Sequence, residues 1–177
     1  HATKEQDSRI KWWLTEAARI QKNSWTDQKR RKNNIYVWAA VGIFQIGIMT
    51  NNQEIINWGK QEFLEVLNNY DSRGFHPFEL ERNPRAYHYH LYMLQPLVYM
   101  AKLSETIGEK WMDNPKLRLA MMTAADVADD ITIIEKITGW KQTTTEGGSW
   151  WWGWYKLLPT DDPIYQRFEV INQNDRR

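Results

Sequence analysis

The chain has 177 residues, a formal net charge of +1 and a mean hydropathy of −0.71, with 42% hydrophobic and 25% charged residues. These values are typical of one water-soluble globular domain and argue against a disordered chain. No apolar run reaches the roughly 20 residues that a bilayer-spanning helix needs. The absence of cysteine excludes a disulfide scaffold and a thiolate zinc site.

Apolar residues recur at helical spacing along most of the chain and predict an all-α protein. Turn and capping signals at Asn51-Asn52, Gly74 and Asn114-Pro115 separate the elements. No alternation typical of β-strands runs for a useful length. Pro96 lies inside the fourth element, where a proline could kink the helix. The predicted helices cover residues 7–22, 35–50, 53–69, 86–107 and 115–130.

The first two helices each carry an apolar stripe that we expect to face the core. Asp7 or Ser8 is the expected N-cap of the first helix. The stripe of the first helix consists of Ile10, Trp13, Leu14, Ala17 and Ile20. The stripe of the second helix consists of Ile35, Trp38, Ala39, Gly42, Ile43 and Ile46.

After Gly139 the sequence becomes polar and then densely aromatic, from Trp150 to Tyr155. These rings suit either stacking on sugar rings or sealing the helices as a packed extension. The tail over 174–177 is expected to fray. We predict one domain over residues 1–177, with residues 143–177 as a Trp-rich C-terminal extension. Antiparallel helices with short connections fit a bundle, a solenoid or part of an α/α toroid.

Two segments carry more specific information. The first, KNNIYVWAA, runs from Lys32 to Ala40, where an Asn-Asn pair opens a helix. The second begins at Gly74, contains GFHPFELERNPRAYHYH and LQPLV, and places an arginine seven residues before a tyrosine. Together the segments resemble the mannuronate-specific alginate lyases of polysaccharide lyase family five. The resemblance extends from Trp12 to Trp140.

The resemblance implies an (α/α) toroid of antiparallel helical hairpins, of which this chain supplies the C-terminal half. The N-terminal half is then expected as an upstream segment or as a separate chain. The implied activity is that of a polysaccharide lyase cleaving a uronic-acid polymer, first of all alginate or polymannuronate, by β-elimination. The resemblance also implies an anionic polysaccharide substrate, a periplasmic or secreted location and no cofactor. No metal, nucleic acid or membrane is expected as a partner.

By the same resemblance, Tyr89, Arg82 and Asn34 are the catalytic residues. A uronate lyase removes the C5 proton beside a carboxylate and expels the oxygen on C4, so its site must neutralise that carboxylate. Asn34 is expected to hydrogen-bond the carboxylate, Arg82 to add positive charge and Tyr89 to carry the proton. The expected substrate-binding residues, with His90 in a positioning role, are Asn33, His90, His88, Arg85, Arg31, Lys32 and Trp38.

One position departs from the family pattern. Ile35 stands where the resemblance expects a catalytic histidine, and an isoleucine can neither accept a proton nor donate a hydrogen bond. His76, His88 and His90 are the candidates for the vacant role, and the sequence does not rank them. The departure leaves two alternatives open: a lyase of glucuronan or another polyuronate, and a non-catalytic polyuronate-binding toroid.

Simpler structural interpretations exist for the three catalytic candidates. Asn34 could cap the second helix, because asparagine is a favoured N-cap residue. Arg82 could form a surface ion pair, and Tyr89 could be a half-buried core aromatic. The spacing of Arg82 and Tyr89 inside the matched segment favours the catalytic interpretation for that pair.

The basic run from Lys29 to Lys32 has two interpretations as well. It either attracts a polyanion beside a cleft near Asn34 or forms a solvated loop. A nucleic-acid-binding helical domain is a third class of function, but the near-neutral charge argues against it. His88 and His90 would project about 200° apart on a helix, which disfavours a shared metal ion.

Overall fold

The structure is a computed structural model that describes residues 3–27, 31–143 and 149–174. Every regular element within these ranges is a helix, which confirms the prediction of an all-α protein. None of the described helices is both long enough and apolar enough to cross a membrane. The α-helices are α1 (Lys4–Asp27), α2 (Asn34–Thr50), α3 (Gln53–Asn68), α4 (Pro77–Leu80), α5 (Ala86–Ser104), α6 (Pro115–Asp129), α7 (Thr132–Thr138) and α8 (Pro163–Asn174). The 3₁₀ helices are η1 (Asn83–Arg85), η2 (Glu105–Ile107), η3 (Trp111–Asp113) and η4 (Ser149–Leu157).

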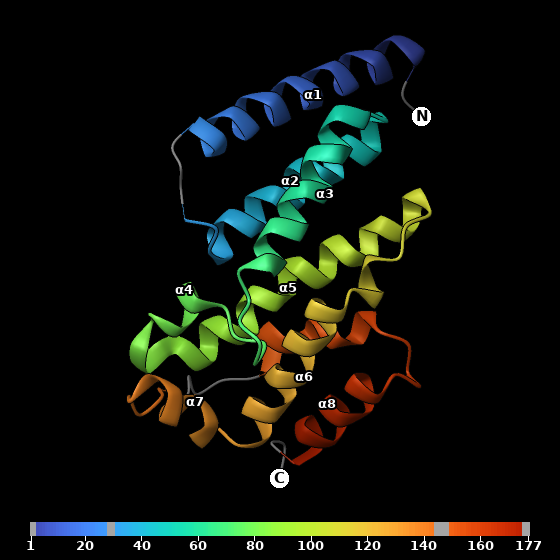
Figure 1. Ribbon diagram of the computed structural model, residues 1–177. Coiled ribbons are helices and arrows are strands. Elements are labelled where there is room, and N and C mark those ends of the chain that lie inside the picture. Colours follow the sequence, from blue (N-terminus) through green and yellow to red (C-terminus); the bar gives the residue numbers. More distant parts are fainter. Residues whose placement is uncertain (1–2, 28–30, 144–148, 175–177) are drawn as a thin grey trace.

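Consecutive long helices pack against one another in a stack of hairpins (Figure 1). α1 lies at one end, α2 and α3 form a tight pair next to it, and α8 lies toward the opposite end. α5 crosses the middle of the stack, where it contacts α2, α6 and η4. The short helix α4 packs on α5. This arrangement confirms the predicted helical hairpins and brings the beginnings of α2 and α5 together.

Asparagines mark the helix ends where the sequence predicted them. Asn51 ends α2 in the left-handed conformation, with φ of 56°, which asparagine adopts more readily than most residues. The side chains of Asn52 and Asn114 cap α3 and α6 by accepting hydrogen bonds from backbone N–H groups. The cap of α2 is Asn33 rather than Asn34.

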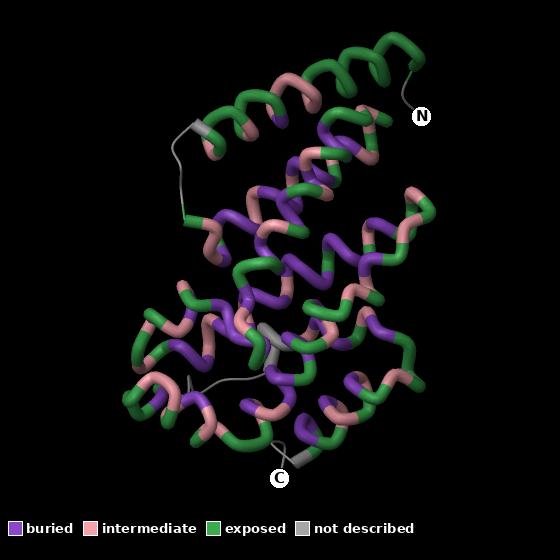
Figure 2. The backbone as a smooth tube through the Cα atoms, in the orientation of Figure 1, coloured by how far each residue is buried: buried purple, intermediate pink, exposed green. Residues whose placement is uncertain are grey.

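α1 differs from its prediction in its start and in its buried face. It begins at Lys4 because Thr3 and Gln6 form a reciprocal capping box, so neither Asp7 nor Ser8 is the cap. Ala18 is its one fully buried described residue, and most of the helix is exposed (Figure 2). Three residues of the predicted core stripe instead face solvent: Ile10 (52% exposed), Trp13 (63%) and Ile20 (62%).

The predicted core stripe of α2 is confirmed only in part: Ile43 is fully buried, and Ile46 is partly buried and packs against the same cluster. The other residues of the stripe are half-buried or exposed. Ile35 is 58% exposed, although it was predicted to face the core. The helix is apolar on nearly every side, so periodicity alone cannot select the inner face. Packing against α1, α3 and α5 selects it instead. The residues of α2 that these helices bury include Tyr36, Val37, Ala40, Val41, Phe44 and Gly47.

One hydrophobic core runs through α2, α3, α5 and α6. Trp111 lies against Phe44 of α2 and Phe63 of α3, with ring centroids 4.9 and 4.8 Å apart, and all three rings are buried. Aromatic contacts of this kind add to the free energy gained by burial. Pro96 lies within α5, and the helix continues through it.

The C-terminal segment is part of the same core. Trp154 and Tyr155 of η4 are buried and lie against Phe168 of α8, with ring centroids 5.0 and 5.3 Å apart. The sealing role is therefore confirmed for these two rings. The side chains of the other tryptophans in the aromatic run, and the tail after α8, lie outside the described residues.

Three α-helices, α4, α7 and α8, were not predicted. Pro163 was interpreted as punctuation, but it occupies the first position of α8, where a proline has no helical hydrogen bond to lose. The seven-residue α7 is too short for periodicity to reveal it. Its end at Gly139 is a conventional glycine cap with φ of 72°.

The close packing of α3 on α2 predicts that Gly59→Ala destabilises the protein. A Cβ at this position would lie 2.5 Å from Cδ2 of Phe44, whose ring is held by Trp111. We expect the free energy of unfolding to fall by about 1–3 kcal/mol. Gly42→Ala is the matched control, because its Cβ would meet no atom within 4 Å and alanine favours the helix by up to about 1 kcal/mol. Urea denaturation followed by circular dichroism measures both changes, and equal effects would contradict this packing.

Candidate active site

Residues from three elements meet at one place beside the beginnings of α2 and α5. Asn34 is the first residue of α2, and Tyr89 lies in the first turn of α5. Glu79 lies in α4, and Arg82 follows α4 immediately before η1. The three elements are joined by side-chain contacts that involve all four residues.

The carboxylate of Glu79 is fully buried and joins these elements. Its Oε1 accepts a hydrogen bond from the backbone N of Asn34 at 2.9 Å, and Asn34 Nδ2 lies 3.2 and 3.1 Å from its two oxygens. Nε of Arg82 donates to Oε2 at 3.4 Å. A buried carboxylate is costly unless it is paired and hydrogen-bonded, so these contacts fix Asn34 and Arg82 relative to α4. Sequence reasoning gave Glu79 no role, although Glu79 lies in the segment that carries the family resemblance and stands between the apolar residues Phe78 and Leu80.

Asn34 is 2% exposed, and its amide nitrogen faces Glu79. This geometry differs from both expectations for the residue. It does not cap α2, because Asn33 does so by accepting from the backbone N of Tyr36 at 3.3 Å. Its Nδ2 is directed at the buried carboxylate rather than toward solvent. Asn34 therefore supports Glu79, and Asn33 caps α2 in its place.

Arg82 lies over the ring of Tyr89. Its guanidinium carbon is 4.6 Å from the ring centroid, and that of Arg85 is 5.7 Å from it. The side chain of Arg82 is 29% exposed and Tyr89 is half-buried, so both reach the surface. Cations over an aromatic face are attracted to it. The structure thus brings the predicted pair together and places two positive charges beside one phenol.

Gln142 fixes the turn that connects Arg82 to α5. The turn includes Asn83 in the left-handed conformation, with φ of 54°. Gln142 is buried; its Oε1 accepts from the backbone N of Tyr87 at 2.8 Å, and its Nε2 donates to the carbonyl of Asn83 at 2.9 Å. It therefore satisfies a free N–H at the start of α5 from a distant part of the chain. No local sequence pattern could have revealed this role, because the partners are 55 residues apart.

The structure ranks the three histidines that the sequence could not. His88 lies against Tyr89, with ring centroids 5.2 Å apart and perpendicular planes, and it is partly exposed. His76 and His90 are fully buried, so neither reaches a ligand at the surface. For His90 this burial fits a positioning role. Within the described ranges, no three His, Asp or Glu side chains are grouped to hold a metal ion.

Trp38 joins the site through a row of rings. Its ring contacts that of Tyr92 at a centroid distance of 5.9 Å, and Tyr92 stacks on His88 at 5.9 Å with planes 12° apart. Because His88 contacts Tyr89, the row connects α2 to the first turn of α5. Trp38 is half-buried, so part of its surface is open to solvent.

The described part of the basic run is paired with carboxylates. Arg31 pairs with Glu81 at 2.5 Å, and Lys32 pairs with Glu62 and Glu65. Burial opposes a charged Lys32, but the two carboxylates overcome it and raise the pKa of the amine. These ion pairs reduce the net positive charge that the run presents. The first half of the run lies outside the described residues.

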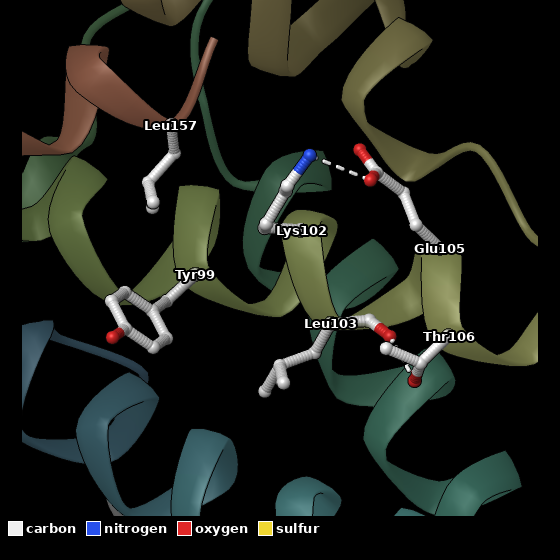
Figure 3. A pocket seen from close by; sticks show the side chains of 6 residues that line it. All are labelled: Tyr99, Lys102, Leu103, Glu105, Thr106 and Leu157. Atoms are coloured by element: carbon white, nitrogen blue, oxygen red, sulfur yellow. Dashed lines mark hydrogen bonds and ion pairs between the residues drawn. The ribbon is translucent and has the colours of Figure 1, made fainter.

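An apolar hollow of about 370 Å³ lies farther along α5 (Figure 3). Tyr99 and Leu103 of α5 and Leu157 of η4 line it, and Lys102 pairs with Glu105 at 2.6 Å beside it. None of the predicted site residues lines this hollow. It is separate from the place where Glu79, Arg82 and Tyr89 meet.

Comparison with solved structures identifies the fold. The chain is similar to alginate lyase A1-III from Sphingomonas species A1, with a TM-score of 0.78 and 20% identity, over 88% of this chain and 46% of that chain. It is also similar to the H192A form of A1-III complexed with a tetrasaccharide, with a TM-score of 0.72 and 20% identity, over 80% of this chain and 41% of that chain. The helical hairpins are therefore part of an α/α toroid.

Sequence comparison identifies the family. The alginate lyase family model matches residues 1–133, and the chain belongs to that family. It is 30% identical to a polysaccharide lyase of Stenotrophomonas maltophilia over 93% of this chain and 50% of the relative. It is 32% identical to an alginate lyase of Pseudomonas aeruginosa over 80% of this chain and 40% of the relative. The chain thus spans about half the length of the relatives it matches.

The buried histidines predict that the protein is sensitive to acid. Burial lowers the pKa of His76 to about 4, and burial together with nearby His76 lowers the pKa of His90 to about 4. Both rings are therefore neutral in the folded chain, whereas an exposed histidine of the unfolded chain titrates near pH 6.5. The unfolded state binds more protons between these values. The free energy of unfolding should thus fall as the pH decreases from 6.5 to 4, by up to roughly 1.4 kcal/mol per pH unit for each ring.

Urea denaturation at pH 7 and at pH 5 measures this effect. His90→Phe keeps an aromatic ring beside Phe75, which lies 4.9 Å from the His90 ring, but removes the titrating group. The variant should lose part of the pH dependence. Identical pH dependence in both proteins would contradict the assignment to His90.

Proposed function

We propose that this chain is the C-terminal half of a polysaccharide lyase that cleaves a uronic-acid polymer, alginate or polymannuronate in the first place, by β-elimination. The observation that carries the proposal is Arg82 over the Tyr89 ring at 4.6 Å, held by a carboxylate buried against Asn34. Membership of the alginate lyase family supports the same reaction. A proton carrier and a fixed cation are the two groups that the reaction needs.

The proposed reaction moves one proton and two electron pairs. The ionised oxygen of Tyr89 takes the C5 proton of the uronate, and the C5–H electron pair forms the C4=C5 double bond. The bond between C4 and the glycosidic oxygen breaks as this double bond forms. Tyr89 then returns its proton to the departing oxygen, which restores the phenolate. One residue can serve both steps where the proton and the leaving group lie on the same face of the ring.

Arg82 and Arg85 supply the positive charge that the reaction requires. A carboxylate beside C5 resists further negative charge, and the two guanidinium groups flanking Tyr89 would offset it. Arg85 makes no ion pair with a described residue, so its charge is available to a ligand. In this scheme Asn34 supports Glu79 instead of contacting the substrate.

We assign the role left vacant at Ile35 to His88. Of the three candidate histidines it is the one that is partly exposed and in contact with Tyr89. Burial, and then the charge of Arg85, lower the pKa of His88, so its ring favours the neutral form. A neutral imidazole can donate or accept a hydrogen bond beside the phenol.

A second candidate function is polyuronate binding without catalysis. Its motivation is Ile35, which is 58% exposed and follows Asn34 at the position where the family pattern has a histidine. Arg82, Arg85 and the ring row of Trp38 would still suit an anionic sugar chain in such a protein. Binding of oligouronates without formation of unsaturated ends would favour this function over the lyase.

The proposed partner is the N-terminal half of the toroid, as an upstream segment or a separate chain. α1 turns large apolar side chains outward, and relatives are about twice as long as this chain. Hydrogen exchange at α1 should slow when that half is present, and unchanged exchange would contradict the proposal. The outward-facing residues of α1 are Ile10, Trp12, Trp13 and Ile20.

We also propose a periplasmic or secreted location, which cell fractionation would test.

Tyr89→Phe is predicted to remove activity while preserving the fold. The substitution keeps the ring under Arg82 and deletes the proton-carrying oxygen, so kcat should fall at least ~100-fold. Tyr99→Phe on the same helix is the control, because Tyr99 is exposed and lies away from the site. Arg82→Lys keeps the charge but loses the planar fork, so it should also be impaired.

The assay follows the ultraviolet absorbance of unsaturated uronate ends. It is run on polymannuronate, polyguluronate and glucuronan with the unaltered protein and with the variants. Near-normal elimination by Tyr89→Phe would refute the mechanism. Elimination confined to glucuronan would keep the mechanism and change the substrate.

Arg85→Gln is predicted to weaken substrate binding more than turnover. The variant should raise KM more than it lowers kcat, and the effect should shrink at high salt because exposed charges are screened. Lys102→Gln removes an exposed charge from the far end of α5 and serves as the control. A loss of kcat that is independent of salt would show that Arg85 acts in another way.

A further inference from the structure

Among the described ion pairs, Glu79 is the most deeply buried carboxylate. It is 0% exposed, whereas its neighbour in sequence, Glu81, pairs with Arg31 at the surface and is 54% exposed in its side chain. Removing a carboxylate from water costs several kcal/mol unless hydrogen bonds and a countercharge compensate it. Asn34 provides three of the four contacts and Arg82 provides the fourth. An ion pair at the surface could stabilise α4 without the free-energy cost of removing the carboxylate from water.

The direction of the Arg82 contact is informative. Glu79 receives Nε of Arg82, which lies on the inner edge of the guanidinium fork. The guanidinium carbon lies over Tyr89 at the same time. Neither terminal amino group of Arg82 has a hydrogen bond or an ion pair with a described residue, and such paired donors suit a second carboxylate well. A negative charge behind Arg82 also reduces the positive potential that reaches the phenol of Tyr89.

We propose that Glu79 is a positioning residue of the lyase site, whose buried charge orients Arg82 over Tyr89 and moderates the positive charge there. The inference rests on the proposed function. Asn34 takes part by holding Glu79 in place, which explains its burial at the start of α2. The class of ligand that Arg82 then receives is the carboxylate of a uronic-acid residue.

The variants Glu79→Gln and Glu79→Asp separate the charge from the shape. Glu79→Gln keeps the length of the side chain and removes its charge, so Arg82 loses its anchor. We expect kcat to fall by up to roughly 100-fold, as for a catalytic group displaced by about 1 Å, with a smaller change in KM. Glu79→Asp keeps the charge but shortens the reach, so it should recover part of the lost kcat. Glu105→Gln, which neutralises an exposed paired carboxylate, should behave as the unaltered protein.

The pH dependence of kcat/KM distinguishes positioning from a general loss of stability. Removing the charge behind Arg82 and displacing Arg82 both change the electrostatic potential at Tyr89, so the rising limb of the profile should shift in Glu79→Gln. Glu79→Asp should leave this limb in place. The ionisable groups that face Tyr89 are Arg82, Arg85 and His88. Those that face Glu79 are Arg82 and Tyr70.

The outcomes separate this inference from the proposed function. Elimination by the unaltered protein, assayed with the N-terminal half of the toroid present, decides the function. No elimination in that assay, while oligouronates still bind, would refute the lyase and leave polyuronate binding. An active protein whose Glu79→Gln variant keeps the normal kcat would overturn the role of Glu79. The role would also be overturned if Glu79→Gln lost activity only in proportion to its unfolded fraction, with the rising limb unmoved. If Glu79→Gln does not fold, the kcat of Glu79→Asp decides. An unchanged kcat in that variant would contradict a positioning role.

Discussion

The carboxylate of Glu79 has no contact with solvent and lies between the first residue of α2 and Arg82. A charge in this position must be fully compensated, and its partners are then held as firmly as the charge itself. Asn34 accordingly turns its amide inward, and Arg82 is held by its Nε while its guanidinium lies over Tyr89. The positions of Asn34 and of Arg82 over Tyr89 thus follow from one buried group.

The rest of the fold holds the start of α2 and the turn at Arg82 in fixed positions on either side of Glu79. The Phe44, Phe63 and Trp111 rings lock α2 to α3, and α2 in turn packs on α5. Gln142 reaches from beyond α7 to hold the turn between Arg82 and Tyr89. Rigid helices and a braced turn are the support that a catalytic constellation requires.

The surface of the chain has a different character at each end of the stack. Near the site, exposed charge and half-buried rings gather beside Tyr89, as suits an anionic sugar polymer. On α1, by contrast, large apolar side chains face outward without a partner among the described residues. Exposed apolar groups in this number are typical of a surface that another polypeptide covers. The half-length match to the relatives agrees with that interpretation.

The sequence by itself determined the helical class, most helix boundaries and the pairing of Arg82 with Tyr89. Helical periodicity, asparagine caps and a fixed spacing within one turn and helix are local properties, so a linear pattern records them. Only the tertiary structure decided that α2 buries Val37 and exposes Ile35, because an evenly apolar helix gains its inner face from its neighbours. It alone revealed Glu79 and Gln142, whose partners lie 45 and 55 residues away. The sequence shows the chemistry of each side chain. Which groups contact the buried carboxylate of Glu79 depends on distances that only the packing of the helices sets.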